Sequence, residues 1–265
     1  MKIVFDNNIT QIISLFLLME KKLNSMIICE IGLNHMGNMK YANEYIEKII
    51  KTNADGILFH IREKSFYETN PKLLLPDKFY INAIKKIKKH NLKFGITIAD
   101  IDKIEFCKNI GVDFYKIFSR DILEKELIKK VLSTKKKIFV STGISNIKEI
   151  KKFEKIIEGK KKQITLVHTH LNKDISKVNL NAMDILKEKF KMNIAYGNHA
   201  ENPFVIYLSL AFQPSDILFY VKGSKYNHHI DEPHSIELKN LEEFIENLKI
   251  LPNALGNKNK IKLKI

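Results

Sequence analysis

Two oppositely charged side chains interrupt apolar segments of the sequence. Glu30 lies within MIICEIG at 26–32, and Lys116 lies within FYKI at 114–117. A buried charge is costly unless it is paired or hydrogen-bonded. A carboxylate in this setting suits substrate binding or acid–base chemistry, and an ammonium suits binding of a phosphate. A structural pair between Glu30 and Lys116 is the alternative, and the two interpretations are compatible.

Hydroxyl side chains follow similar apolar segments. Ser119 comes shortly after Lys116, and the turn Ser141-Thr142 ends another such segment. Lysine supplies charge, hydroxyls and backbone N–H groups supply hydrogen bonds, and the start of the next helix adds its dipole. This combination predicts an anion site suited to a phosphate. A Schiff base between Lys116 and a carbonyl substrate is the other chemistry open to this lysine.

Histidine and asparagine side chains gather near the ends of the same segments. A lone histidine is more often structural than a metal ligand, but several on converging strand ends favour a metal site. The residues of this kind are Asn34, His35, His168, His170, Asn198, His199, His228, His229 and His234.

Short apolar segments alternate with amphipathic helices from Met26 onward, which favours a parallel sheet with crossover helices. Strands are predicted at 27–32, 56–60, 93–97, 114–117, 137–141, 163–168, 193–196 and 217–221. Helices are predicted at 40–52, 78–90, 101–109, 123–133, 147–158, 179–190, 203–212 and 238–248. Such strand–helix units close a single (β/α)8 TIM barrel, whose reactive groups meet at the C-terminal strand ends. A doubly wound open sheet is the alternative, but its Gly-rich nucleotide turn is absent.

The predicted organisation is one barrel at 26–255, a short N-terminal extension at 1–25 and a basic tail at 256–265. The extension is either an added helix or the result of a misplaced translation start. Its apolar run is too short to span a bilayer and lacks the features of a signal peptide. The long loop at 62–76 is expected to carry binding groups.

The chain carries 45 Lys and Arg against 30 Asp and Glu, a net charge of +15. Such an excess suits nucleic acid, an acidic membrane surface or a small anionic substrate. Because the lysines recur along the predicted helices, we favour a solvated surface and expect neither nucleic acid nor a membrane as partner. Cys29 and Cys107 form no metal or disulfide motif, which favours a reducing, cytoplasmic location.

Five short motifs, spread in order over about 26–255, resemble the N-acetylneuraminate (sialic acid) synthase family. They are CEIGLNHMG at 29–37, GVDFYKIFS at 111–119, STG at 141–143 with Glu149-Ile150 downstream, VNLN at 178–181 and YGNH at 196–199. Each motif is weak alone, but together and in this order they are specific.

The resemblance implies a β/α barrel that condenses phosphoenolpyruvate with an N-acylated amino sugar, such as N-acetylmannosamine, to form a 2-keto acid and phosphate. It also implies a homodimer and a divalent metal, Mn²⁺ or Mg²⁺, held by two histidines at the barrel mouth. Glu30 and Lys116 are the catalytic candidates: Glu30 matches the family's acid that contacts the sugar, and Lys116 matches a phosphoenolpyruvate-binding position. That match disfavours the Schiff-base role for Lys116. His199 matches the first metal ligand, and His234 is our candidate for the second. Substrate-binding roles are assigned to Asn34, His35, Ser119, Asp121, Ser141, Thr142, His168 and Asn198.

Several positions depart from the family pattern. A second phosphoenolpyruvate lysine is expected where Leu58 stands, a glutamine where His60 stands, and the second metal histidine where Val221 stands. Phe219 occupies the position of a glutamate, and we expect no C-terminal antifreeze-like domain.

Neighbouring residues offer compensation for these losses. Arg62 or Lys64 follows the lost lysine, Lys222 adjoins the lost histidine, and a loop histidine (His228, His229 or His234) is within reach of a metal in principle. Without compensation, the chain would be a catalytically impaired barrel that binds a sugar or a protein partner. That is the alternative function.

Overall fold

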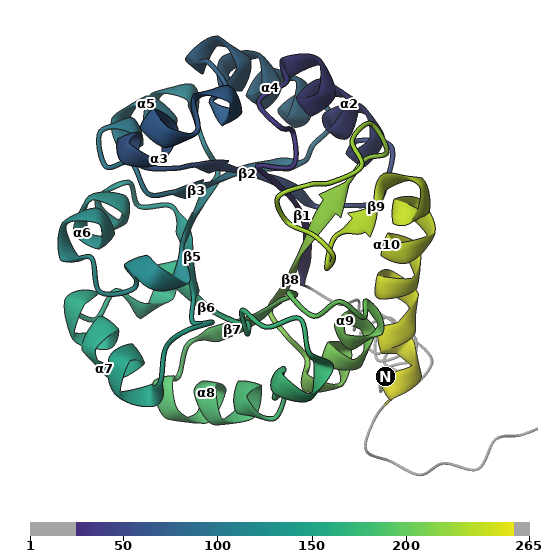
Figure 1. The fold of residues 1–265 in the computed structure, drawn as a ribbon. Helices are drawn as coiled ribbons and strands as arrows, with labels where there is room; N and C mark the ends of the chain where they lie inside the picture. The colour runs from purple at the N-terminus through teal and green to yellow at the C-terminus, as the bar shows by residue number, and fades with distance from the viewer. Residues whose placement is uncertain (1–24, 257–265) are drawn as a thin grey trace, which may run out of the picture.

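The chain closes into a parallel barrel surrounded by helices, as Figure 1 shows from one end of the barrel. The structure, a computed structural model, describes residues 25–256. The strands follow one another in sequence order, and β1 pairs with β8 to close the ring. The predicted TIM barrel is therefore confirmed, and the open-sheet alternative is wrong. The predicted extension and tail lie outside the described residues, except for Ser25 and Gly256.

The strands match the sequence prediction to within one residue at each end. They are β1 (Met26–Gly32), β2 (Gly56–Ile61), β3 (Lys93–Ile98), β4 (Phe114–Ile117), β5 (Lys137–Ser141), β6 (Ile164–His168), β7 (Asn193–Gly197) and β8 (Asp216–Lys222). A two-residue strand, β9 (Ile236–Glu237), pairs with the end of β8.

The helices also lie where their amphipathic patterns predict. They are α2 (Met39–Ile49), α4 (Asp77–Lys89), α5 (Lys103–Ile110), α6 (Lys125–Ser133), α7 (Ile147–Ile156), α8 (Ala182–Phe190), α9 (Phe204–Ser209) and α10 (Leu241–Ile250). The long loop after β2 contains a further short helix, α3 (Lys64–Thr69), and a 3₁₀ turn, η1 (Pro71–Leu73). Helix α8 begins later than predicted, and Asn179, at the predicted start, has a φ of +49°.

Two layers of side chains fill the middle of the barrel. The lower layer is an apolar plug made of Ile28, Leu58, Phe114, Phe139, Val167, Ala195 and Leu218. Residues two positions apart in a strand point to the same face. The next layer up therefore includes Glu30, His60, Thr97, Lys116, Ser141, Thr169 and Tyr220. Apolar side chains therefore close the middle of the barrel, and polar side chains lie directly above this plug.

Gly95 on β3 shows how tightly this plug is packed. A Cβ atom added there would overlap the ring of Phe114. The glycine is needed so that the Phe114 ring can cross the barrel and stack edge-on against Phe139, with ring centroids 5.4 Å apart.

An ion pair between Lys137 and Asp216 lies two positions below the plug, at the opposite end of the barrel from Glu30. Burial raises the pKa of Asp216 more than Lys137 and Ser215 lower it.

Within residues 25–256, no helix is long and apolar enough to cross a membrane.

Candidate active site at the barrel mouth

Glu30 and Lys116 form a buried ion pair at the centre of the mouth. The Lys116 Nζ lies 2.6 Å from Oε1 and 2.7 Å from Oε2 of Glu30. Burial alone would raise the pKa of Glu30, but Lys116 and His60 outweigh it and lower this pKa to about 2. The carboxylate is therefore ionised at neutral pH. The two charges that interrupt apolar strands are brought together, as the structural interpretation predicts.

His60 and Tyr220 complete the contacts around Glu30. The His60 Nε2 lies 3.6 Å from the nearer Glu30 oxygen and 3.5 Å from the Tyr220 hydroxyl. The Lys116 ammonium also lies over the Tyr220 ring, 5.8 Å from its centroid. Burial lowers the pKa of His60, although Glu30 opposes this effect, so the ring is neutral at pH 7.

Two imidazoles meet at the same opening. The ring centroids of His199, beyond β7, and His234, between β8 and β9, are 4.8 Å apart. Both rings also contact Tyr220, at 5.5 and 5.1 Å respectively, which joins them to the Glu30 cluster. Burial lowers the pKa of His199 to about 3 and that of His234 to about 4, so both are neutral at pH 7.

The two imidazoles have the protonation state that a divalent metal requires of its histidine ligands. Metal-binding histidine must be neutral, and its second nitrogen is usually held by a hydrogen bond. The His199 Nδ1 lies 2.8 Å from the Thr169 hydroxyl, while both ring nitrogens of His234 are buried without a hydrogen-bond partner. No group of three or more metal-ligating side chains occurs in the described part of the chain. These two imidazoles would therefore need additional ligands from water or substrate.

The other two loop histidines lie apart from this pair. The side chain of His228 is 96% exposed, and the His229 Nε2 is 2.9 Å from the Tyr41 hydroxyl. Of the three loop histidines considered as replacement ligands, only His234 reaches His199. Val221 faces the outer helix-packed core with Phe219, so neither side chain lies on the inner face of β8.

Asp231 is a mouth residue that the sequence prediction did not assign. A Cβ on Gly32 would lie 2.8 Å from the Asp231 Oδ2 and 2.8 Å from the Tyr220 ring, so only glycine fits between β1 and this carboxyl. Burial, with the nearby Glu30, raises the pKa of Asp231 to about 7. Its Oδ2 is buried without a hydrogen-bond partner.

The loop that carries Asp231 and His234 is fixed to β1 and α2. Asn34 accepts a 2.9 Å bond from the Asp231 N–H and donates to the Val221 carbonyl and the Ser235 hydroxyl. In Figure 1 this loop passes beside β1 on its way to β9. Asn34 was predicted to bind substrate, but its side-chain hydrogen bonds position this loop instead.

A second anchor for this loop is aromatic. The Tyr45 hydroxyl accepts a 2.8 Å bond from the Gly223 N–H, and the Tyr41 hydroxyl contacts His229. Lys222 pairs with Glu232 at 2.6 Å, so the lysine beside Val221 is engaged within the loop.

The predicted hydroxyls divide into two groups. Ser141 shares the inner polar layer, and the Ser119 hydroxyl accepts a 3.0 Å bond from the Gly143 N–H, which joins the ends of β4 and β5. Thr142 instead donates to the Val167 carbonyl at 2.9 Å and helps to hold β5 to β6. Asp121 pairs with Arg120 at 3.3 Å, and burial raises the pKa of Asp121.

Three other predicted binding residues are not brought to Glu30. His168 follows the inward-facing Val167 and so points outward, where its Nε2 lies 2.9 Å from the Val178 carbonyl. Asn198 accepts from the Tyr196 hydroxyl and donates to the Ala200 carbonyl. The His35 ring lies 6.1 Å from Phe59, on the outer side of β2, and its Nδ1 accepts from the Gly37 N–H.

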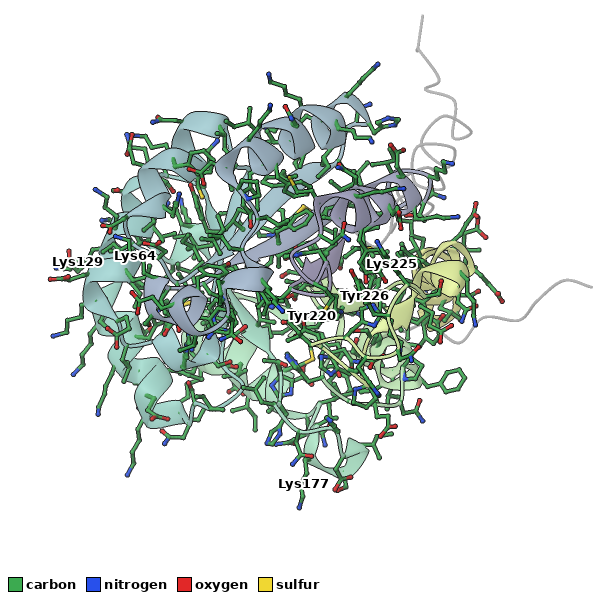
Figure 2. The ribbon with its side chains drawn as sticks, turned by 45° about the horizontal axis from the view of Figure 1, so that its top comes forward. Lys64, Lys129, Lys177, Tyr220, Lys225 and Tyr226 are labelled. Atoms are coloured by element: carbon green, nitrogen blue, oxygen red, sulfur yellow. The ribbon has the colours of Figure 1, made fainter. Side chains whose placement is uncertain are left out.

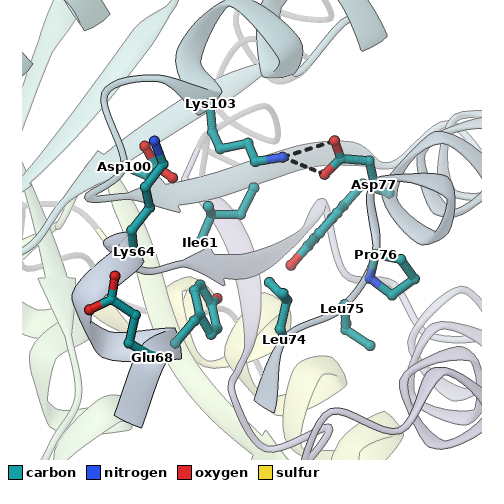
Figure 3. A pocket seen from close by; sticks show the side chains of 11 residues that line it. Ile61, Lys64, Glu68, Leu74, Leu75, Pro76, Asp77, Asp100 and Lys103 are labelled. Atoms are coloured by element: carbon teal, nitrogen blue, oxygen red, sulfur yellow. Dashed lines mark hydrogen bonds and ion pairs between the residues drawn. The ribbon is translucent and has the colours of Figure 1, made fainter. Parts of the chain in front are cut away.

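A cavity of about 500 Å³ lies beside the mouth on the outer face of β2. Figure 3 shows Ile61, Leu74 and Leu75 as its apolar lining, with the Lys103–Asp77 ion pair at 2.8 Å along one side. Lys64 lines this cavity and pairs with Asp102 at 2.7 Å. Figure 2 likewise shows Lys64 well to the side of Tyr220. This cavity is therefore distinct from the Glu30 cluster.

A closed barrel with acidic, basic and imidazole groups at one strand-end opening has the architecture of a β/α-barrel enzyme. The NeuB family model matches residues 39–260, and the chain belongs to the NeuB family. At the level of the family, it is a protein of the sialic acid synthase type, whose members are generally metal-dependent.

Individual relatives agree with this membership. The chain is 26% identical over 260 residues to the N,N'-diacetyllegionaminic acid synthase of Campylobacter jejuni, covering 88% of this chain and 78% of the relative. It is 23% identical to a pseudaminic acid synthase of the same species, covering 87% and 75%. Its fold matches the N-acetylneuraminic acid (sialic acid) synthetase of Leptospira borgpetersenii solved with citrate, with a TM-score of 0.82, 24% identity and coverage of 91% and 88%.

Proposed function

We propose that this chain condenses phosphoenolpyruvate with an N-acylated amino sugar to form a nonulosonic 2-keto acid. The main support is the convergence of the Glu30–Lys116 ion pair and the His199–His234 imidazoles in one barrel mouth. In this reaction the enol carbon bonds to the sugar aldehyde carbon, the aldehyde oxygen gains a proton, and water replaces the phosphate.

Lys116 is proposed to bind the anionic enol. Its ammonium is shared with Glu30, so an entering substrate anion competes with that carboxylate for the same charge. Ser119 and Ser141 offer hydroxyl groups close to the ends of β4 and β5. Glu30, ionised because its pKa is about 2, would then accept hydrogen bonds from sugar hydroxyls.

Asp231 is suited to proton transfer at the sugar oxygen. Since its pKa is about 7, the carboxyl exists in both protonation states at neutral pH. A group with such a pKa is effective as a general acid near that pH. We propose that it donates its proton to the oxygen that develops from the sugar aldehyde.

His199 and His234 would hold the divalent metal, Mn²⁺ or Mg²⁺. When bound, such a metal supplies Lewis-acid polarisation of the sugar aldehyde. Thr169 orients the His199 ring through its 2.8 Å contact with Nδ1 and leaves Nε2 toward other groups. A cytoplasmic location and a homodimer are part of the same proposal.

A barrel that binds a sugar or a protein partner without catalysis is the second candidate. It is favoured by Leu58, which puts hydrocarbon in the plug where a substrate-binding lysine is expected. The neutralisation of Lys116 by both oxygens of Glu30 favours it as well.

Release of inorganic phosphate distinguishes the two candidates. The full chain is incubated with Mn²⁺, phosphoenolpyruvate and a panel of N-acylated amino sugars that includes N-acetylmannosamine. The synthase proposal expects phosphate release only when sugar is present and none from Lys116→Met. A folded protein that releases no phosphate with any sugar contradicts catalysis and supports the binding barrel.

A further inference from the structure

Within residues 25–256, Lys116 is the only lysine of the inner polar layer. Its charge is neutralised by Glu30. Both oxygens of Glu30 engage that ammonium, and the neighbouring strand carries Leu58 in the apolar plug. A phosphorylated enol brings more than one negative charge into this mouth. A second cation in the mouth would strengthen binding of the phosphate through charge-assisted hydrogen bonds.

Arg62 enters the mouth from the same strand that lost the lysine. Leu58 and His60 point into the barrel, and Arg62 follows them at the same two-residue spacing, directly after β2. Its guanidinium lies over Phe66, 4.0 Å from the ring centroid, and 5.4 Å from that of Phe118. Because the His60 ring packs against the same Phe118 ring at 5.0 Å, Arg62 lies above His60 and next to the end of β4.

The charge of Arg62 acts on groups inside the mouth. It helps to lower the pKa of His60, and it opposes the rise in the pKa of Asp231 and of Tyr220. The Arg62 side chain is 19% exposed, which leaves it accessible to a small ligand while limiting screening by water.

Lys64, the other cation near the lost lysine, faces away. Its ammonium pairs with Asp102 at 2.7 Å, its side chain is 71% exposed, and it lines the outer cavity of Figure 3. Of the two cations that the sequence offered as compensation, Arg62 therefore lies beside the mouth and Lys64 lies at the outer cavity.

Glu63 holds Arg62 without using all of its donors. The Arg62 Nε and Nη2 donate to the two oxygens of Glu63 at 3.1 and 3.3 Å. Arg120 also donates to Glu63, at 2.6 Å. Burial would raise the pKa of Glu63, but the two guanidiniums lower it to about 2. A guanidinium has five N–H donors, so Arg62 retains donors for an incoming oxyanion.

We propose that Arg62 binds the phosphate of phosphoenolpyruvate in place of the lysine whose position Leu58 occupies. This inference rests on the proposed function. Glu63 positions the guanidinium, while Lys116 is left to bind the carboxylate end of the same substrate.

Calorimetric titration with phosphoenolpyruvate and with pyruvate, which lacks the phosphate, tests this assignment. Arg62→Met is expected to weaken phosphoenolpyruvate binding about 10- to 100-fold, as for loss of charge-assisted hydrogen bonds. It should change pyruvate binding less than about 3-fold, because the phosphate contact is absent there. Arg62→Lys should recover part of the loss, since it keeps the charge but not the planar fork. Lys64→Met is the matched control and should leave both affinities unchanged.

The outcomes separate the inference from the function. If wild-type protein binds phosphoenolpyruvate and Arg62→Met binds it equally well, the Arg62 assignment is overturned and the synthase proposal stands. Equal weakening of pyruvate and phosphoenolpyruvate in both Arg62 variants would show a structural role and also overturn it. If the wild-type protein does not bind phosphoenolpyruvate at all, the proposed function fails and the inference fails with it.

Discussion

Lys116 donates to both oxygens of Glu30 across the barrel mouth, although the two residues are 86 positions apart in the sequence. The pair sits directly on the apolar plug, and each partner compensates the burial of the other. It fixes the electrostatic character of the mouth, because every substrate anion that reaches Lys116 must compete with Glu30.

Removal of Lys116 should therefore be costly to folding as well as to activity. Lys116→Met leaves Glu30 ionisable, buried and without its cation, for which we expect a loss of about 3–5 kcal/mol in unfolding free energy. The double variant Glu30→Gln, Lys116→Met should regain most of this loss, because no uncompensated charge remains. Denaturant unfolding of both variants measures the difference. Lys116→Met protein as stable as the wild type would contradict the pairing.

The same pair predicts an acid-sensitive component of stability. The pKa of Glu30 falls from its usual value of 4.5 to about 2 in the folded chain, so folding favours the ionised form. This contribution is complete above pH 4.5 and is lost as the pH falls toward 2. The unfolding free energy of the wild type should thus decline more steeply in this window than that of the Glu30→Gln, Lys116→Met variant. Parallel curves would show that Glu30 is not perturbed by folding.

His234 should be required for metal binding even though it comes from a loop. His234→Ala removes one of two neighbouring neutral imidazoles, and we expect Mn²⁺ affinity to drop at least about 10-fold in titrations followed by electron paramagnetic resonance. His228→Ala is the control, since that side chain is 96% exposed and contacts the loop carboxylate Glu232 only at 4.0 Å. Similar Mn²⁺ affinities in the two variants would remove His234 from the proposed site.

Gly95 offers a test of the apolar plug that is independent of activity. A methyl group at this position would overlap Phe114, so Gly95→Ala should lower the unfolding free energy by about 1–3 kcal/mol. Adding Phe114→Leu should relieve the overlap and recover part of the loss. If the double variant is no more stable than Gly95→Ala, the ring does not limit space at β3.

Strand alternation carried most of the predictive information in the sequence. It located the eight strands within one residue and put Glu30 and Lys116 at the same opening. The same rule contained the signal for Tyr220 and His60, which lie two positions beyond the plug residues Leu218 and Leu58. The family motifs point to neither of these two residues as a ligand, whereas strand parity places both on the inner face.

The position of a residue in a family motif did not predict whether its side chain points into the barrel or outward. His168 and Asn198 lie at strand ends but on the outward-facing register, and Val221 likewise packs into the outer core. His234 was proposed from the sequence as the second metal ligand, but Asp231 was given no role. The position of Asp231 depends on loop contacts with Asn34 and α2 that span nearly the whole chain.

A crystal structure of the protein soaked with Mn²⁺ and phosphoenolpyruvate would test the convergence of these groups most directly. We expect an anomalous manganese peak next to His199 and His234, and phosphoenolpyruvate in contact with Lys116 inside the same mouth. Manganese bound elsewhere, or phosphoenolpyruvate bound outside the mouth with the Glu30–Lys116 pair undisturbed, would contradict the proposed active site.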